Sequence, residues 1–316
     1  MWDQGGPCHK RLSSLPDIDT IRQDTVLTTF QPLGTAFAFL LGLAFGSFLN
    51  VVLVRLPEDE SILHPGSHCR HCDHTLAWWE NIPLLSWIVL RGRCRQCHTH
   101  IGVQYPLVEL AMALLWAACW ISFSTPLFLT FTQRPLDLVL VLLIGHALLC
   151  WLLVALATLD AKHLWLPDWL TFPGIALGLA FSVAISLSNG MHHNTWLSDV
   201  WTRILEAALA AGVILVIRLA YWLVRRREGM GLGDAKLMAM LGVWLGLEGA
   251  LESFVLSILA ATAAALVWLI ILAARHRTRE WGQLPLPLGT FLCLAALSEI
   301  FYPGWLFTQW SRTFLP

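Results

Sequence analysis

The chain has 316 residues, of which 57% are hydrophobic and only 13% are charged, and its formal net charge is −1. Soluble domains carry about 25% charged residues, so the composition excludes an ordinary soluble domain. It indicates an all-α protein that crosses a membrane several times. We expect the lipid bilayer, and no nucleic acid, among its partners.

The first 32 residues are expected to form a polar tail rather than a signal peptide. They contain Asp3, Asp17, Asp19 and Asp24, and they lack an early apolar core with a small-residue cleavage site. The first membrane-spanning helix is therefore expected over 33–54, and residues 303–316 are expected to form a C-terminal tail.

Residues 55–104 form the one sizeable polar insert, and they carry a distinctive cysteine pattern. Two Cys-x-x-Cys pairs with 21 residues between them supply four candidate ligands, Cys69, Cys72, Cys94 and Cys97. This spacing fits a tetrahedral structural zinc site, and a metal suits an insert too small to bury much core. We expect a small zinc-ribbon-like unit.

Disulfides, a redox-active pair and another metal are the alternatives for these cysteines. Disulfides are rare in a reducing cytoplasm, and a thioredoxin-type pair needs only one Cys-x-x-Cys. Nearby histidines, such as His71 and His98, are expected to be solvated because the four-cysteine set is complete without them. Cys119, Cys150 and Cys293 lie in apolar runs and are expected to be buried small hydrophobes.

The apolar blocks predict about eight membrane-spanning helices, and residues 105–302 are expected to form one transmembrane domain. Three of the blocks are short and contain glycine or proline, so broken or re-entrant helices are an alternative for them. The blocks lie at 34–54, 105–123, 137–158, 172–187, 203–224, 235–248, 252–274 and 284–301.

Basic residues gather in alternate connections and predict the orientation of the chain. One side of the membrane receives most of the basic residues. They are Arg55, the arginines of the insert, Lys162, the run Arg225–Arg227, Arg275, Arg277 and Arg279. By the positive-inside rule this side is cytoplasmic. The insert is therefore expected in the cytoplasm and both chain ends outside.

Two aspartates at the edges of apolar blocks are candidate functional residues. Asp160 ends one block and Asp234 begins another, both on the expected cytoplasmic side, and charges at membrane depth usually serve a function. An N-cap role would explain Asp234, whereas a carboxylate near a helix C-terminus, as at Asp160, opposes the helix dipole. Capping and packing roles stay open on position alone.

A pair of such carboxylates can hydrolyse a peptide without a metal or a covalent intermediate. At a separation of about 3 Å they share one proton, so one activates a water and the other protonates the carbonyl oxygen. Gly231 and Gly233 are expected to allow unusual backbone conformations and close approach of a substrate strand. A phosphate-binding loop fits poorly, because the segment lacks Gly-x-x-x-x-Gly-Lys-[Ser/Thr] and follows no strand.

Several motifs in the same order resemble the type IV prepilin peptidases, and the match covers almost the whole chain after the tail. The paired cysteines, the Asp160 segment and Gly231-x-Gly-Asp234 all match. The other matching segments are Gly46-Ser-Phe-Leu-Asn-Val-Val-Leu-Val-Arg-Leu-Pro57, Glu80-Asn-Ile-Pro-Leu-Leu-Ser-Trp87, Leu90-Arg-Gly-Arg-Cys94 and Tyr105-Pro-Leu-Val-Glu109.

The resemblance implies an intramembrane aspartyl protease of the bacterial inner membrane, with Asp160 and Asp234 as its catalytic residues. Its substrates would be prepilins or pseudopilins of type IV pili or type II secretion systems, cut after the glycine that ends a basic leader. Many members also methylate the new N-terminal amine with S-adenosylmethionine. The cysteine insert is typical of those bifunctional members.

No fingerprint locates the site for S-adenosylmethionine, and the insert with Glu80 and Gly92 is the expected region. One departure from the family is Pro287-Leu-Gly289-Thr290, where Pro-Phe-Gly-Pro is usual. It is expected to lie away from the motifs, as a packing variation or a change in the substrate groove. A peptidase without methyltransferase activity, a proton-coupled transporter and a membrane redox protein remain as alternatives.

Overall fold

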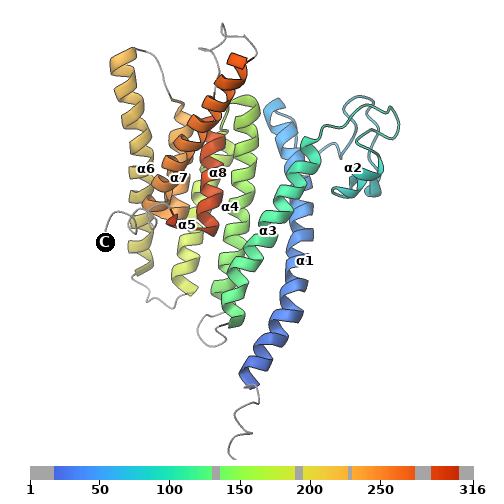
Figure 1. The fold of residues 1–316 in the computed structure, drawn as a ribbon, viewed down its shortest axis with the longest axis horizontal. Helices are drawn as coiled ribbons and strands as arrows, with labels where there is room; N and C mark the ends of the chain where they lie inside the picture. Colours follow the sequence, from blue (N-terminus) through green and yellow to red (C-terminus); the bar gives the residue numbers. More distant parts are fainter. Residues whose placement is uncertain (1–17, 130–135, 189–194, 227–229, 275–285, 306–316) are drawn as a thin grey trace, which may run out of the picture.

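The structure, a computed structural model, describes residues 18–129, 136–188, 195–226, 230–274 and 286–305 (Figure 1). Within these ranges the chain is helical, with no β-strand beyond two isolated bridges in the insert. Most of both expected tails and the basic residues Arg227, Arg275, Arg277 and Arg279 lie outside the described residues.

The body of the molecule consists of long apolar helices. They are α1 (Ile18–Arg55), α3 (Gln104–Leu129), α4 (Leu136–His163), α5 (Asp168–Ser188), α6 (Thr195–Arg225), α7 (Leu232–Ala274) and the shorter α8 (Leu288–Phe301). Among the described residues, six helices are long and apolar enough to cross a membrane. The all-α polytopic fold predicted from the sequence is confirmed.

Helix α7 contains a break that explains why the sequence shows two apolar blocks there. Gly246 has a φ of 78° and a ψ of 174°, which is not helical. A side chain at this position would also lie 2.9 Å from the guanidinium of Arg203. When the two parts of α7 are counted separately and α8 is included, the described residues contain eight apolar helical segments, as predicted.

Helix α1 begins at Ile18, well before the span expected from residue 33, and continues without interruption to Arg55. It packs along α3, and both helices contact α4 (Figure 1). The expected tail is therefore helical from residue 18 onward.

Helix α8 packs against both α4 and α7 and so joins the two helices that carry the candidate aspartates. Fully buried leucines lie at the centre of this contact, among them Leu156 on α4, Leu241 on α7 and Leu292 on α8. Large apolar side chains remain exposed on the outer faces, such as Val216 on α6 and Ile270 on α7. Lipid is the solvent that suits such faces.

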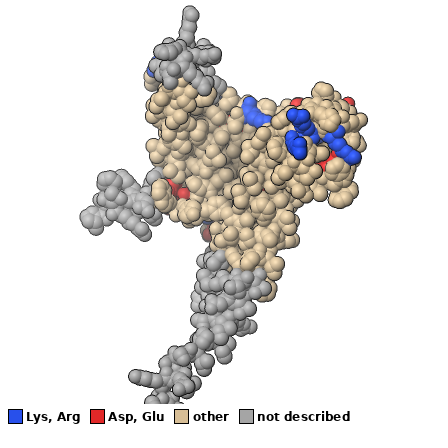
Figure 2. All heavy atoms as spheres, turned by 45° about the vertical axis from the view of Figure 1, so that its right-hand side comes forward, with Lys and Arg blue, Asp and Glu red and all other residues tan. Residues whose placement is uncertain are grey.

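The insert extends sideways from one end of the bundle, between the end of α1 and the start of α3 (Figure 1). It contains two 3-10 turns, η1 (Leu56–Glu58) and η2 (Trp78–Asn81), and the short helix α2 (Leu85–Val89). Figure 2 shows that basic side chains gather on the insert, whereas the helical body in this view is almost free of charge. The exposed arginines of the insert are Arg70, Arg91, Arg93 and Arg95.

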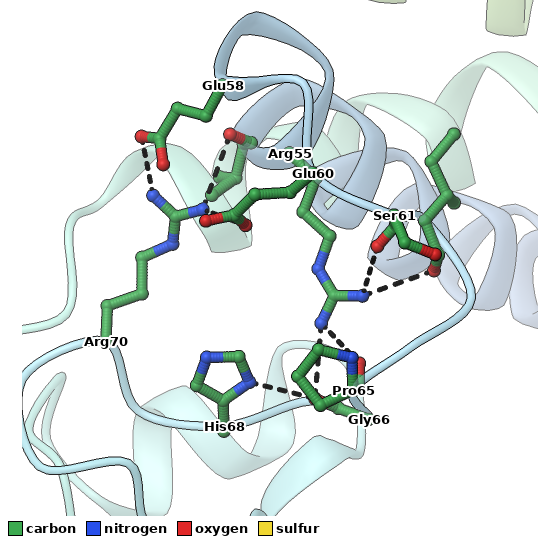
Figure 3. A network of polar contacts seen from close by, with 10 residues as sticks. Arg55, Glu58, Glu60, Ser61, Pro65, Gly66, His68 and Arg70 are labelled. Atoms are coloured by element: carbon green, nitrogen blue, oxygen red, sulfur yellow. Dashed lines mark hydrogen bonds and ion pairs between the residues drawn. The ribbon is translucent and has the colours of Figure 1, made fainter.

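Arg55, the last residue of α1, anchors the start of the insert. Its buried guanidinium donates to the carbonyl oxygens of Ser61, Ile62, Pro65 and Gly66 over 2.9, 3.3, 2.6 and 3.2 Å (Figure 3). A guanidinium presents five donors in a fixed planar fork. The single side chain of Arg55 can therefore pair with the carbonyl oxygens of the whole turn at residues 61–66.

We expect the insert to unfold locally more often in the Arg55→Lys variant, because an ammonium group cannot make all the hydrogen bonds of the planar guanidinium. Losing two buried hydrogen bonds costs about 2 kcal/mol, which corresponds to roughly 30-fold more frequent local opening. Limited proteolysis of the purified protein measures this as the rate of cutting within residues 61–66.

Arg70→Lys is the matched control for this experiment. Arg70 makes ion pairs with Glu58 and Glu60 at 2.7 and 2.9 Å, but all three side chains are more than two-fifths exposed (Figure 3). Exposed ion pairs contribute little, so its cutting rate should stay near that of the wild type. Equal rates for both variants would contradict the anchoring role of Arg55.

Candidate functional site

Asp160 and Asp234 line the same cavity, at the end of the bundle where α4 ends and α7 begins. The cavity has a volume of about 590 Å³, and Gly231 and Gly233 form part of its wall. The structure thus brings together the four residues that the sequence singled out around the aspartates. They come from segments more than 70 positions apart, which α8 holds side by side.

Asp160 lies in the last turn of α4 and is almost completely buried. The helix ends just after it, because Leu164 takes a left-handed conformation and donates its N–H to the carbonyl oxygen of Asp160. The dipole of α4 disfavours a carboxylate at this position. An ionised Asp160 therefore needs donors from another element.

The donors come from Thr290 in the first turn of α8. Its backbone N–H donates to Oδ2 of Asp160 over 2.6 Å. Its hydroxyl lies 3.0 Å from the same oxygen and 3.1 Å from the carbonyl oxygen of Ala157. The first N–H groups of a helix have no partner within the helix, so α8 presents a donor where α4 places a carboxylate.

The expectation that the departure at Leu288 and Thr290 lies away from the motifs is wrong. Thr290 bonds directly to Asp160, and Leu288 lines the cavity. Gly289 is also close, since a Cβ there would lie 3.0 Å from the carboxyl carbon of Asp160. The departure itself was the available signal, but a contact between residues 130 positions apart cannot be read from the sequence.

Asp234 lies in the first turn of α7 and is half-buried. Gly231 lies beside this carboxylate, since a Cβ built on it would be 3.5 Å from Oδ2 of Asp234. This N-terminal position favours negative charge through the helix dipole. The two aspartates therefore lie at opposite helix ends but in one cavity.

One part of the expectation for the two glycines before Asp234, an unusual backbone conformation, is not met. Neither takes a positive φ, so no unusual backbone conformation is present at these positions. A Cβ on Gly233 would lie 3.1 Å from the Cβ of Leu166, so its lack of a side chain permits close packing. At Gly231 the nearest atom to such a Cβ is Oδ2 of Asp234, at 3.5 Å, which leaves this part of the cavity wall open.

An ion pair between Asp168 and Lys236 borders the same cavity, and sequence reasoning missed it. The Lys236 ammonium lies 2.5 Å from the Asp168 carboxylate and links the start of α5 to α7. Trp165 and Trp169 lie on the same wall, and Trp169 is 80% exposed. Asp168 thus links two helices in addition to starting α5.

The four cysteines of the insert come together as predicted, with all four sulfur atoms within 4.8 Å of one another. The Sγ atoms of Cys69 and Cys97 are 3.7 Å apart, and those of Cys72 and Cys94 are 4.0 Å apart. Zinc–sulfur bonds of about 2.3 Å in a tetrahedron require sulfur–sulfur distances of about 3.8 Å. The donor set therefore fits a zinc ion.

Both cysteine pairs lie in turns of the same construction. Asp73 donates its N–H to the carbonyl oxygen of Cys69 over 2.8 Å, and His98 donates to that of Cys94 over 3.0 Å. Asp73 and His98 have φ values of 55° and 56°. Each turn thereby directs two thiols toward the other pair.

A second cavity, of about 500 Å³, lies between the insert and the adjoining ends of α1 and α3. Asn50 of α1 and Glu80 of η2 line it, and both are buried. In the part of the chain that the structure describes, Oδ1 of Asn50 and Oε1 of Glu80 have no hydrogen-bond partner. Buried polar atoms are nearly always paired, so these two atoms are available to accept hydrogen bonds from a ligand or a water molecule.

Glu80 is held in a fixed orientation beside this cavity. Its Oε2 accepts the N–H of Ala77 over 2.8 Å and lies 3.2 Å from Nε2 of His74. The bond from the Ala77 backbone, assisted by the interactions with His74 and Arg95, lowers the pKa of Glu80. Oε1, which lies 3.9 Å from the guanidinium of Arg95, therefore belongs to a carboxylate that is ionised at neutral pH.

Two family models match the chain in succession. The Bacterial Peptidase A24 N-terminal domain matches residues 40–123, and the Type IV leader peptidase family matches residues 147–270. A protein of Myxococcus xanthus named prepilin leader peptidase/N-methyltransferase is 39% identical over 293 residues, covering 90% of this chain and 77% of the relative. The chain belongs to the type IV leader peptidase family.

Other relatives in this family carry the same name. One from Burkholderia pseudomallei is 37% identical, covering 84% of this chain and 85% of its own length. One from Aeromonas hydrophila is 34% identical, covering 87% of this chain and 90% of its own. No solved structure matches the chain significantly.

The matched ranges divide the candidate site residues of this leader peptidase family member. The four cysteines lie in the first range, and Asp160 and Asp234 lie in the second. Helix α8 with Thr290 lies outside both.

We expect the purified protein to contain zinc bound by the four cysteines, and Cys97→Ala to lose most of it, because three thiolates leave the tetrahedral site open. Without the metal the insert loses its main link, so proteolysis within residues 67–101 should become faster. Metal analysis measures the first effect and protease digestion the second.

Cys119→Ala provides the same chemical change in the membrane helices. Cys119 lies in α3 beside Cys150, with 3.8 Å between their sulfur atoms. This variant should keep its zinc. Equal zinc contents in the two variants would exclude the proposed ligand set.

Proposed function

We propose that the chain is a prepilin or pseudopilin leader peptidase that cleaves its substrate with Asp160 and Asp234. The observation that carries this proposal is the meeting of both carboxylates in one cavity at a helix end, in a member of the type IV leader peptidase family. The names of its relatives supply the substrate class.

The reaction is hydrolysis by a carboxylate pair that holds one proton between its two members. The ionised carboxylate takes a proton from a water molecule, whose oxygen adds to the scissile carbonyl carbon, while the other carboxyl group protonates the carbonyl oxygen. When the C–N bond breaks, the leaving amine takes the proton from the first group. The hydroxyl group formed on the former carbonyl oxygen then returns a proton to the second carboxylate, so the pair is regenerated.

The shape of the site suits a substrate that lies partly in lipid. The wall is open at Gly231, and the exposed Trp169 borders the same cavity. Indole rings favour the membrane interface. We propose that the apolar helix of the substrate lies in the bilayer and its leader junction reaches the cavity from the cytoplasm, the side that the basic connections favour.

Asp160→Asn and Asp234→Asn should each abolish cleavage of a model prepilin, by at least about 10³-fold, since an amide can neither accept nor supply the required proton. Mass spectrometry of a prepilin incubated with membranes that contain each variant measures the product. The two substitutions preserve size, so both variants should retain the bundle.

Asp199→Asn is the control for this pair. Asp199 accepts a hydrogen bond from Ser186 over 2.6 Å, at the far end of α5 from the cavity, and should leave cleavage unchanged. Cleavage by either Asp160→Asn or Asp234→Asn would reject the aspartyl mechanism.

A second activity, methylation of the new N-terminal amine, is proposed for the cavity beside the insert. Within the described residues, Oδ1 of Asn50 and Oε1 of Glu80 lack a hydrogen-bond partner, which favours this activity, as does the name of the relatives. S-adenosylmethionine combines a sulfonium cation, a ribose, an adenine and an amino-acid end. The cavity offers the carboxylate of Glu80 for the ammonium or ribose hydroxyls, Arg95 for a carboxylate and Trp87 for the adenine ring.

The volume of about 500 Å³ lies in the range of cavities that hold cofactor-sized ligands. When bound, S-adenosylmethionine supplies an electrophilic methyl group. The residues of this chain then orient the ligand and hold the amine of the product near it. Zinc would keep the walls of the cavity together, because Cys69 and Cys94 belong to both the metal cluster and the cavity lining.

Glu80→Gln should reduce methylation by about 10-fold or more while cleavage continues, because the amide keeps the shape but loses the charge. Mass spectrometry of the mature pilin, incubated with S-adenosylmethionine, separates the product from the form that is heavier by one methyl group. Binding of radiolabelled S-adenosylmethionine provides an independent readout.

Glu60→Gln is the matched control. Glu60 lies in the same insert, but its side chain is exposed and pairs with Arg70. An unmethylated product from the wild-type protein would identify a peptidase without the second activity. Undiminished methylation by Glu80→Gln would show that the cofactor binds elsewhere in the protein.

A further inference from the structure

We propose that Thr290 is a positioning residue that holds the single negative charge of the aspartate pair on Asp160. This leaves Oδ1 of Asp160 as the oxygen that takes the proton from the attacking water, and Asp234 as the group that protonates the carbonyl oxygen. The inference rests on the proposed peptidase function and deepens it by assigning the two roles.

The first argument is the geometry at Oδ2 of Asp160. The Thr290 N–H, 2.6 Å away, can only donate, so Oδ2 acts as its acceptor. The Thr290 hydroxyl lies 3.0 Å from the same oxygen. Hydrogen bonds to a carboxylate favour its charged form, so both donors stabilise an ionised Asp160.

The second argument is the difference between the two aspartates. Asp160 has a backbone donor and a hydroxyl on one oxygen, whereas Asp234 has the backbone of Gly231 beside it as a weaker source of stabilisation. The dipoles of α4 and α7 favour the opposite assignment, but charge-assisted hydrogen bonds exceed dipole effects. The N-terminus of α8 also adds its own dipole at Asp160.

Other titratable groups surround the pair without taking over the role of Thr290. Cys293 of α8 is buried nearby, and Lys162 and His163 follow Asp160 on α4 but are exposed. Lys162 donates to Gln104, and Lys236 is paired with Asp168. Within the described ranges, none of these groups donates to Oδ2 of Asp160.

Thr290 can be replaced without removing a bond that α8 needs. It is the third residue of the helix, so its N–H has no partner within α8. Proline is tolerated in the first turn of a helix. Thr290→Pro therefore removes both donors, Thr290→Val removes the hydroxyl alone, and Thr290→Ser keeps both.

The experiment measures kcat/KM for prepilin cleavage against pH with the full-length protein in lipid. Removing donors to the charged form makes the pair harder to ionise, so the acid limb of the profile should move to higher pH. We expect a shift of about one pH unit for Thr290→Pro and about half a unit for Thr290→Val. Below the limb this amounts to about 10-fold and about 3-fold lower kcat/KM, with little change at high pH. Thr290→Ser should restore the wild-type profile.

Thr158→Val is the matched control, because Thr158 lies on α4 near Asp160 but its hydroxyl donates to its own helix, at the carbonyl oxygen of Val154. Its acid limb should not move. A wild-type acid limb in every folded Thr290 variant, whatever the level of activity, would overturn the proposal. Loss of activity at all pH values without a shift would likewise reduce Thr290 to a structural role.

The same preparations distinguish this failure from failure of the peptidase assignment. If Asp160→Asn still cleaves, the proposed function itself falls. If Asp160→Asn and Asp234→Asn are inactive and the Thr290 profiles do not move, only the assignment of roles falls.

Discussion

Burial of the Asp160 carboxylate is the constraint on which the cavity end of the bundle depends. The residue ends a helix whose dipole opposes its charge, and it is almost fully enclosed. Unsolvated charge of this kind is costly unless donors are supplied. Thr290 supplies them from α8, and α8 in turn packs against α7, which carries Asp234. The ends of three helices thus meet around the two candidate carboxylates, because the buried Asp160 needs hydrogen-bond donors.

The insert, too, is held together by a few specific contacts. It is too small to bury a substantial core, so three kinds of cross-link hold it. Four cysteines form a metal-sized cluster, Arg55 collects four carbonyl oxygens, and Glu109 of α3 accepts the N–H of Leu84 over 2.7 Å. The cavity between the insert and the helices is therefore lined partly by the residues that give the insert its shape.

The two cavities are associated with the same end of the bundle, where α1 and α4 both terminate (Figure 1). Cleavage creates an amine, and the amine is what the second activity would modify. A separate cavity for each reaction lets the carboxylate pair stay buried among apolar helices. The cofactor-sized cavity can meanwhile be built from the polar residues of the insert.

The sequence alone determined the membrane class, the apolar segments and the cysteine cluster, because each depends on composition or on spacing within one local pattern. Asp160 and Asp234 were also identifiable, since charged residues at the edges of apolar blocks are unusual. The sequence misjudged the place of Thr290, and it gave no sign that α1 begins as early as Ile18. The contacts of Thr290 with Asp160, and of Gly233 with Leu166, join positions far apart in the chain. Only the tertiary structure could decide them, because the packing of α8 against α4 fixes which donor faces the buried carboxylate.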